Sequence, residues 1–164
     1  MMNIISFLIY TIIALATFLF WEFVAWFTHK YIMHGFLWRW HKSHHTLHHH
    51  VVERNDLFAV VFSMPCITLF YYFSLVRYNP YMLAVATGIL FYGIFYFIFH
   101  DVIVHQRLKW NPKKGKYLQR IIHAHYIHHS KHTKENCEAF GFLIAPKKYQ
   151  PKQFTQKKSR QETQ

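Results

Sequence analysis

The sequence predicts an all-α integral membrane protein with about three to four transmembrane helices and a cytoplasmic, histidine-rich helical cap that holds a dinuclear metal site. Three observations lead to this prediction. Three long runs of the chain are apolar and nearly free of charged residues, as membrane-spanning helices require. Histidines recur in matched groups next to the ends of these runs. Lys and Arg outnumber Asp and Glu by 19 to 7, and they lie mostly outside the runs.

The length of 164 residues is that of one domain. We expect a single membrane-embedded domain over residues 1–146 and a basic, disordered tail over 147–164, where Lys and Gln are frequent and no apolar period is present. The net charge of +12 would also suit a nucleic-acid-binding protein. Such proteins do not need runs of about twenty apolar residues, so we expect no nucleic acid partner.

The first apolar run covers residues 4–27 and has neither a basic segment before it nor a small-residue cleavage site after it. It is therefore typical of a membrane anchor rather than a signal peptide. The second run covers 57–76 and the third 81–99, with a turn between them. Gly88 and Gly93 in the third run predict close packing against another helix.

Ten histidines follow a pattern that occurs twice: a pair separated by four residues, then a triplet at positions i, i+3 and i+4. They are His29, His34, His41, His44 and His45, and then His100, His105, His125, His128 and His129. Positions i, i+3 and i+4 share one face of a helix, so each triplet directs three imidazoles the same way. Of the other histidines, we interpret 48–50 as a solvated loop, with the alternative that His48, four residues after His44, touches the site. We place His123 and His132 off the ligand face.

The number of membrane crossings predicts that all ten histidines lie on one side. The first run ends at the first pair, the next two runs cross and return, and the second pair follows at once. Of the 19 Lys and Arg residues, only Arg77 falls in the opposite loop. By the positive-inside rule, the histidines and the C-terminus are cytoplasmic and the N-terminus is outside.

Two short helices carry the triplets in this prediction. A break at Gly35 is followed by a helix over 37–45, and a second helix runs from about residue 117 to 130. In the second helix an apolar stripe leads directly into His125, His128 and His129. The apolar residues dock the helix, and the imidazoles continue the stripe into the interior.

The number of candidate ligands indicates a pair of metal ions. Imidazole nitrogen suits zinc, copper, nickel and iron, so the histidines alone leave the metal open. With only two cysteines, no Cys-x-x-Cys zinc pattern is present. Ten ligands in two similar sets exceed what one mononuclear site uses. A dinuclear iron site beside a membrane would suit activation of dioxygen and attack on an unactivated C–H bond.

Four polar side chains are candidates for supporting the histidines: Glu22, Asn55, Asp56 and Asp101. Glu22 lies seven residues before His29, on the same helix face. A buried carboxylate there is costly unless paired, so it either hydrogen-bonds to a ligand histidine or extends to the interface. Asp101 either orients a neighbouring imidazole or pairs with Arg107.

Five stretches of the chain resemble the bacterial β-carotene 3-hydroxylases, a family within the fatty acid hydroxylase and sterol desaturase superfamily. They are His-Lys-Tyr-Ile-Met-His-Gly (29–35), His-Lys-Ser-His-His (41–45), Asn-Asp-Leu-Phe-Ala-Val-Val-Phe (55–62), His-Asp-Val-Ile-Val-His-Gln-Arg (100–107) and Cys-Glu-Ala-Phe-Gly-Phe-Leu-Ile-Ala-Pro (137–146). The resemblance covers about residues 20–146. The histidine pattern alone indicates the superfamily, and the flanking residues indicate the carotenoid enzymes.

The resemblance implies a non-haem di-iron monooxygenase of the bacterial inner membrane that uses two iron ions, dioxygen and electrons from reduced ferredoxin. Its substrates would be carotenoids. It would hydroxylate C3 of the β-ionone ring, converting β-carotene through β-cryptoxanthin to zeaxanthin, and canthaxanthin towards astaxanthin. The family's metal ligands fall on the ten patterned histidines, with no separate protein acid or base assigned. The basic cytoplasmic face would attract an acidic ferredoxin or anionic lipid headgroups.

Two other functions remain open from the sequence. A hydroxylase or desaturase of the same superfamily could act on an acyl chain or a sterol. A membrane metal transporter or metal-binding protein would use the histidines as cargo sites, but a transporter should carry ionisable ligands at mid-bilayer depth. The only such residue in the predicted spans is Glu22, near one end.

Overall fold

Helices joined by turns and irregular segments make up the described part of the chain, which comprises residues 3–46, 52–110 and 115–151 of the computed structural model. No strand is present within these ranges. The α-helices are α1 (Ile4–Phe27), α2 (Trp38–His41), α3 (Leu57–Tyr71), α4 (Pro80–Tyr96) and α5 (Lys116–His129). The π-helical segments Thr28–Phe36, Tyr72–Val76 and Phe97–Val104 continue α1, α3 and α4. Short 3-10 helices cover Lys42–His45, Arg54–Asp56 and Lys147–Tyr149.

Three helices of the described ranges are long and apolar enough to cross a membrane. They are Ile4–Phe36, Arg54–Val76 and Pro80–Val104. Many large apolar side chains on their outer surfaces are exposed, which suits contact with lipid rather than water. The predicted fold class is therefore confirmed, with three spanning helices in the described residues, and the chain is an integral membrane protein.

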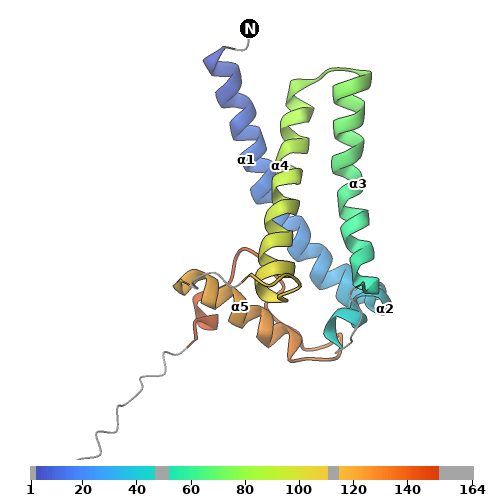
Figure 1. Ribbon diagram of the computed structural model, residues 1–164, viewed down its shortest axis with the longest axis vertical. Helices are drawn as coiled ribbons and strands as arrows, with labels where there is room; N and C mark the ends of the chain where they lie inside the picture. The colour runs from blue at the N-terminus through green and yellow to red at the C-terminus, as the bar shows by residue number, and fades with distance from the viewer. Residues whose placement is uncertain (1–2, 47–51, 111–114, 152–164) are drawn as a thin grey trace, which may run out of the picture.

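The spanning helices place their histidine-bearing ends together (Figure 1). Helices α3 and α4 run antiparallel and are joined by a tight turn, and α1 lies beside α4. Helix α5 and the segment after it lie across the end of the molecule that is farthest from the α3–α4 turn, near α2. The second pair and triplet thus return to the end at which the first pair and triplet emerge, as the number of crossings predicts.

Close packing of α1 against α4 depends on Gly88. A Cβ atom at this position would lie 2.5 Å from the Ala14 carbonyl oxygen and 2.7 Å from the Thr17 Cβ, which excludes any larger residue without movement of α1. The prediction for Gly93 is wrong, because a Cβ atom there would have no neighbour within 4 Å. Only one of the two glycines therefore serves helix packing.

Helix α5 is held against the segment that follows it. Ile121, Ala124, Ala145 and Tyr149 form one buried apolar cluster. Because Tyr149 is buried and Lys147–Tyr149 form a 3-10 helix, the ordered part of the chain continues past residue 146, where the sequence predicts the tail to begin. Residues 152–164 of the predicted tail lie outside the described ranges, as does the predicted loop at 48–50.

Candidate metal centre

His29 and His34 lie on the π-helical segment Thr28–Phe36, and His100 lies on the segment Phe97–Val104, which ends just before His105. In an α-helix, positions i and i+5 point about 140° apart. In a π-helix, hydrogen bonds join residues five apart, so these positions return to nearly the same side. The His105 N–H donates to the His100 carbonyl at 2.9 Å in this way. The ring centroids are consequently 5.2 Å apart in the pair His29 and His34, and 4.6 Å apart in His100 and His105.

The structure sorts nine of the ten patterned histidines into two groups that can each hold a metal ion. The five-histidine group contains His29, His34, His41, His45 and His128. The four-histidine group contains His44, His105, His125 and His129. Within each group, one nitrogen of every ring lies within 4.8 Å of the others. The tenth histidine, His100, lies beside the four-histidine group, with its Nε2 3.1 Å from the His44 Nε2.

The two triplets exchange one histidine each. His41 and His45 join the first pair, whereas His44 projects into the four-histidine group. His125 and His129 join the second group, whereas His128 projects into the first. Each triplet therefore gives its i and i+4 positions to one group and its i+3 position to the other, so each group depends on both halves of the chain.

The hydrogen bonds of the rings leave nitrogen lone pairs facing one another. The Nδ1 atoms of His29 and His128 donate to the carbonyl oxygens of Phe140 and Glu138 at 2.9 and 2.8 Å. The Nδ1 atom of His41 donates to Asn55 Oδ1 at 2.7 Å. Since these acceptors are oxygens, Nδ1 carries the proton and Nε2 is an unprotonated metal-binding nitrogen.

Several Nε2 atoms approach one another closely. The pairs are His29–His41 at 3.1 Å, His34–His128 at 3.2 Å, His41–His45 at 3.2 Å, His44–His100 at 3.1 Å and His105–His125 at 2.9 Å. Where both Nδ1 atoms carry the protons, the two Nε2 lone pairs repel each other unless a cation lies between them. The buried His129 Nε2 has no hydrogen-bond partner at all. These atoms therefore fit metal ions in both groups.

Burial keeps three of the ligand histidines outside the spanning helices neutral: His45, His105 and His128. Burial, with smaller contributions from neighbouring imidazoles, lowers the pKa of His105 to about 3. Burial likewise lowers the pKa of His45 to about 4 and that of His128 to about 3, although backbone hydrogen bonds oppose the shift. A neutral imidazole is the form that binds a metal, so no proton has to be displaced near pH 7.

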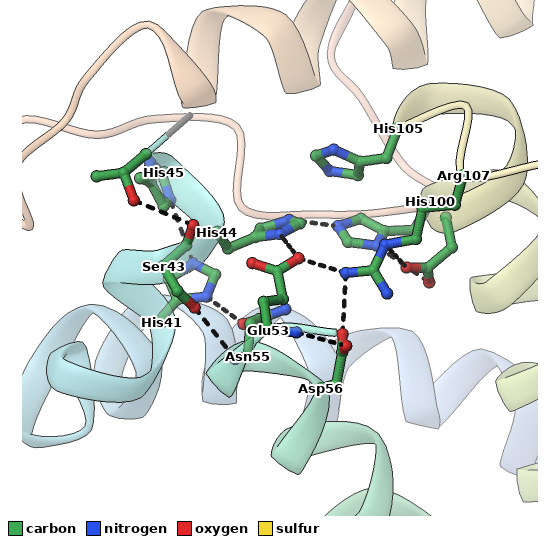
Figure 2. A network of polar contacts seen from close by, with 12 residues as sticks. His41, Ser43, His44, His45, Glu53, Asn55, Asp56, His100, His105 and Arg107 are labelled. Carbon is green, nitrogen blue, oxygen red and sulfur yellow. Dashed lines mark hydrogen bonds and ion pairs between the residues drawn. The ribbon is translucent and has the colours of Figure 1, made fainter. Parts of the chain in front are cut away.

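Carboxylates surround the four-histidine group. Glu53 Oε1 accepts a hydrogen bond from His44 Nδ1 at 3.1 Å and also pairs with Arg107 (Figure 2). Asp101 lies 3.4 Å from His100 Nδ1 and 3.3 Å from Arg107 Nε. Both alternatives considered for Asp101 are thus present together. Arg107 links the two carboxylates that reach histidines.

Two of the predicted supporting residues do not contact a histidine. Asp56 pairs with Arg107 at 2.9 Å and accepts from the Glu53 backbone N–H. Glu22 is buried and neither bonds to a histidine nor extends to the interface: its Oε1 accepts from the backbone N–H groups of residues 142–144 and its Oε2 from Tyr92. The physical reason is that this C-terminal segment folds back over α1 and supplies the donors that the buried carboxylate needs.

Glu22 nevertheless acts on the site through the segment that it holds. The ring of Phe142 stacks on His29 with centroids 5.2 Å apart, and the Phe140 carbonyl orients the same histidine. A Cβ atom at Gly141 would lie 2.7 Å from the Ile144 carbonyl oxygen and 3.3 Å from Glu22 Oε1. The tight turn around the carboxylate therefore requires a glycine.

Sequence reasoning missed Glu53 and the backbone carbonyls that orient the rings. Glu53 stands two positions before Asn55, and its role could have been inferred from that proximity. The carbonyls of Lys131 and Lys134, which accept from His45 and His34, carry no residue-type signal. The two histidines placed off the ligand face donate to backbone oxygens instead: His123 to Tyr149 and His132 to His45.

Comparisons with known proteins assign the chain to a family. The fatty acid hydroxylase family matches residues 14–145. A beta-carotene hydroxylase of Paracoccus sp. (strain PC1) is 42% identical over 138 residues, covering 82% of this chain and 83% of the relative. One from Pseudescherichia vulneris is 46% identical over 129 residues, covering 77% and 71%. A chloroplastic beta-carotene 3-hydroxylase of Arabidopsis thaliana is 33% identical, covering 77% and 42%. No solved structure matches the chain significantly.

Proposed function

Because the chain belongs to the fatty acid hydroxylase family, we propose that it is a membrane monooxygenase that hydroxylates C3 of the β-ionone rings of carotenoids. The substrate follows from the relatives, which are beta-carotene hydroxylases at 42% and 46% identity. The observation that carries the chemistry is the convergence of unprotonated Nε2 atoms in two groups at the end of three spanning helices. The products from β-carotene are β-cryptoxanthin and then zeaxanthin, and canthaxanthin gives astaxanthin.

The metal that we propose is iron, with one ion in each histidine group. The five-histidine group would hold one ion, and the four-histidine group together with His100 would hold the other. Two such ions supply the activation of dioxygen that attack on an unactivated C–H bond requires. One oxygen atom of dioxygen enters the C–H bond, and the other leaves as water after uptake of two electrons and two protons.

The protein's own residues prepare the site for this reaction. Backbone carbonyls and Asn55 fix the ring orientation in the five-histidine group, while Glu53 and Asp101 do so beside the other. The near-complete burial of His29, His41 and His128 keeps water from the first group. Exclusion of water protects reactive oxygen chemistry from side reactions.

The charge distribution supports a cytoplasmic orientation in a bacterial inner membrane. Among the Lys and Arg residues of the described ranges, only Arg77 lies at the α3–α4 turn, so most of their positive charge lies towards the histidine end. By the positive-inside rule this end faces the cytoplasm and the N-terminus faces outside. A reduced ferredoxin, which is acidic, would be attracted to this basic surface and deliver the electrons.

The family description favours one alternative, a hydroxylase of fatty acyl chains. Expression of the chain in cells that accumulate β-carotene distinguishes the two functions. We expect chromatography of the pigments to show β-cryptoxanthin and zeaxanthin with the intact chain and neither with His128→Ala. Unchanged β-carotene, with iron bound to the protein and hydroxylated acyl chains in the lipid fraction, would replace the carotenoid function by the alternative.

A further inference from the structure

We propose that the cavity between α1, α3 and α4 receives the ring end of the carotenoid from the bilayer, and that Gly93 keeps this cavity wide enough for the ring. The proposal rests on the proposed function, because it assigns the place where that substrate binds. It adds an access route and a residue that sets the width of the site.

The cavity has a volume of about 540 Å³ and mostly apolar walls. The walls include Phe58, Phe62 and Cys66 from the second spanning helix and Ile89, Gly93 and Phe97 from the third. A cavity of this size and character suits an apolar ligand of several rings or a ring with part of a chain. A carotenoid ring with the adjoining polyene is such a ligand.

The cavity opens sideways towards the hydrocarbon of the membrane. Ala59, Gly93 and Phe97 line it, lie on spanning helices and are exposed, so the cavity is open at these positions. A carotenoid dissolved in the bilayer can therefore reach the cavity without leaving apolar surroundings. Passage through water, which would be costly for such a substrate, is avoided.

The inner end of the cavity contacts both sides of the histidine cluster. Its wall includes Phe142, stacked on His29, and Tyr96, stacked on His100 with centroids 4.7 Å apart. Asn55, which accepts from His41, lines the cavity as well. Single side chains thus separate the cavity from the two groups, so a ring at this end lies next to the proposed metal ions.

Polar groups occupy one edge of the otherwise apolar wall. The cavity is lined there by Asp56, Asp101 and Arg107. The side chains of Asp56 and Arg107 are partly exposed. A hydroxyl group leaving the metal site can hydrogen-bond with these side chains instead of being buried without a partner. The edge therefore suits the hydroxylated product, while the remaining wall suits the unmodified ring.

Gly93 offers a direct way to test this assignment. A Cβ atom at this position would meet nothing within 4 Å, so a larger side chain extends into the cavity and leaves the backbone in place. Gly88, five residues earlier on the same helix, differs because a side chain there would collide with α1. Substitution of Gly93 therefore narrows the cavity without breaking the helix packing.

A smaller cavity of about 420 Å³ supplies the matched control. It is lined by residues of α1, α5 and the segment 139–149, among them Leu19 and Trp26. Its Phe140 wall has ring contacts with His29, His34 and His128 of the five-histidine group. Added bulk at Leu19 fills this second cavity and leaves the first one unchanged.

The experiment compares Gly93→Ala, Gly93→Leu and Ala59→Leu with the controls Leu19→Trp and Ala16→Leu, the latter on an exposed part of α1. Three quantities are measured: pigments formed in β-carotene-accumulating cells, iron per chain, and β-carotene retained by the purified metal-loaded protein in detergent. We expect Gly93→Leu and Ala59→Leu to lower hydroxylated product and retained carotenoid by about tenfold or more, with iron per chain unchanged. Gly93→Ala should show a smaller loss, and both controls should match the unmodified chain.

Full product formation and retention by Gly93→Leu and Ala59→Leu would overturn the cavity assignment while the hydroxylase function stands. Loss in Leu19→Trp with normal activity in the Gly93 variants would also overturn it and assign the substrate to the smaller cavity. If the unmodified chain forms no hydroxylated carotenoid, the proposed function fails. Retained carotenoid that depends on Gly93 would still support the cavity in that case.

Discussion

The two histidine groups are built from the same sequence pattern, but their surroundings differ in charge. In the five-histidine group, the Nδ1 atoms donate to neutral oxygens, such as the Phe140 carbonyl and Asn55 Oδ1. Beside the four-histidine group, His44 donates to the Glu53 carboxylate and His100 lies against Asp101. A carboxylate raises the basicity of the imidazole more than a carbonyl does, so equal ligand spacing produces two unequal sites.

The groups also differ in enclosure. All five members of the first group are buried, whereas His105 and His129 of the second are partly exposed. We therefore expect the four-histidine group to be the one that solvent and small molecules reach more readily. Carboxylate partners and partial exposure together distinguish the four-histidine group from the five-histidine group, although the same histidine pattern in the sequence supplies both.

The largest effect is expected from substitution of His44 or His128. Each of these histidines lies in the metal group formed mainly by the other half of the chain. His44→Ala and His128→Ala should both reduce hydroxylated carotenoid to the background level, because each removes a nitrogen that faces another Nε2. Pigment chromatography and iron per chain measure the effect. His123→Ala is the control and should retain most activity, because this ring donates to the Tyr149 carbonyl. Equal loss in all three variants would contradict the assignment of the groups.

Neutralising a carboxylate tests whether charge distinguishes the groups. Glu53→Gln keeps the shape of the side chain but removes the charge beside His44. We expect the affinity of the four-histidine group for iron to fall about 10- to 100-fold, and the affinity of the five-histidine group to stay unchanged. Titration of the metal-free protein with ferrous iron, followed in two steps, measures both affinities. Asn55→Ala should instead weaken the site of the five-histidine group. Loss of both ions in either variant would mean that the sites do not act separately.

Releasing the segment that Glu22 holds should affect the five-histidine group first. Glu22→Ala leaves three backbone N–H groups and the Tyr92 hydroxyl without their acceptor, at a cost of about 1–3 kcal/mol for each group that stays buried and unpaired. Thermal unfolding in detergent and amide hydrogen exchange at residues 142–144 measure this change. Glu22→Gln retains an acceptor oxygen and should lose less. Normal exchange at these amides in Glu22→Ala would refute the contact.

The smallest effect is expected for Asp56→Asn. Asp56 touches no histidine and is linked to the site through its ion pair with Arg107 and the hydrogen bond from the Glu53 backbone N–H. The Asp56 and Arg107 side chains are 30% and 29% exposed. Exposed ion pairs contribute about 0–1 kcal/mol, so activity should change by less than about fivefold. Rates of zeaxanthin formation at equal protein level measure it. A loss as large as that of Glu53→Gln would show that the whole carboxylate network matters, rather than only the carboxylates that touch a histidine.

The sequence by itself determined the three spanning helices, because runs of about twenty apolar residues have few alternatives to a membrane helix. It also determined the candidate ligands and their common end of the molecule, since the number of crossings follows from the order of the runs. Helix α5 was predictable as well, because its apolar stripe leads into His125 and His128.

Only the tertiary structure decided how these histidines divide. The π-helical winding that aligns His29 with His34 costs local hydrogen-bond geometry, and it persists because both rings pack into a shared centre. The exchange of His44 and His128 depends on how the 3-10 helix Lys42–His45 and the distant helix α5 face each other. The ring orientation depends on backbone carbonyls such as that of Phe140, and every residue type has one. The residue types in the sequence do not predict the division of the histidines or the orientation of their rings, because both depend on the position of a distant segment of the chain.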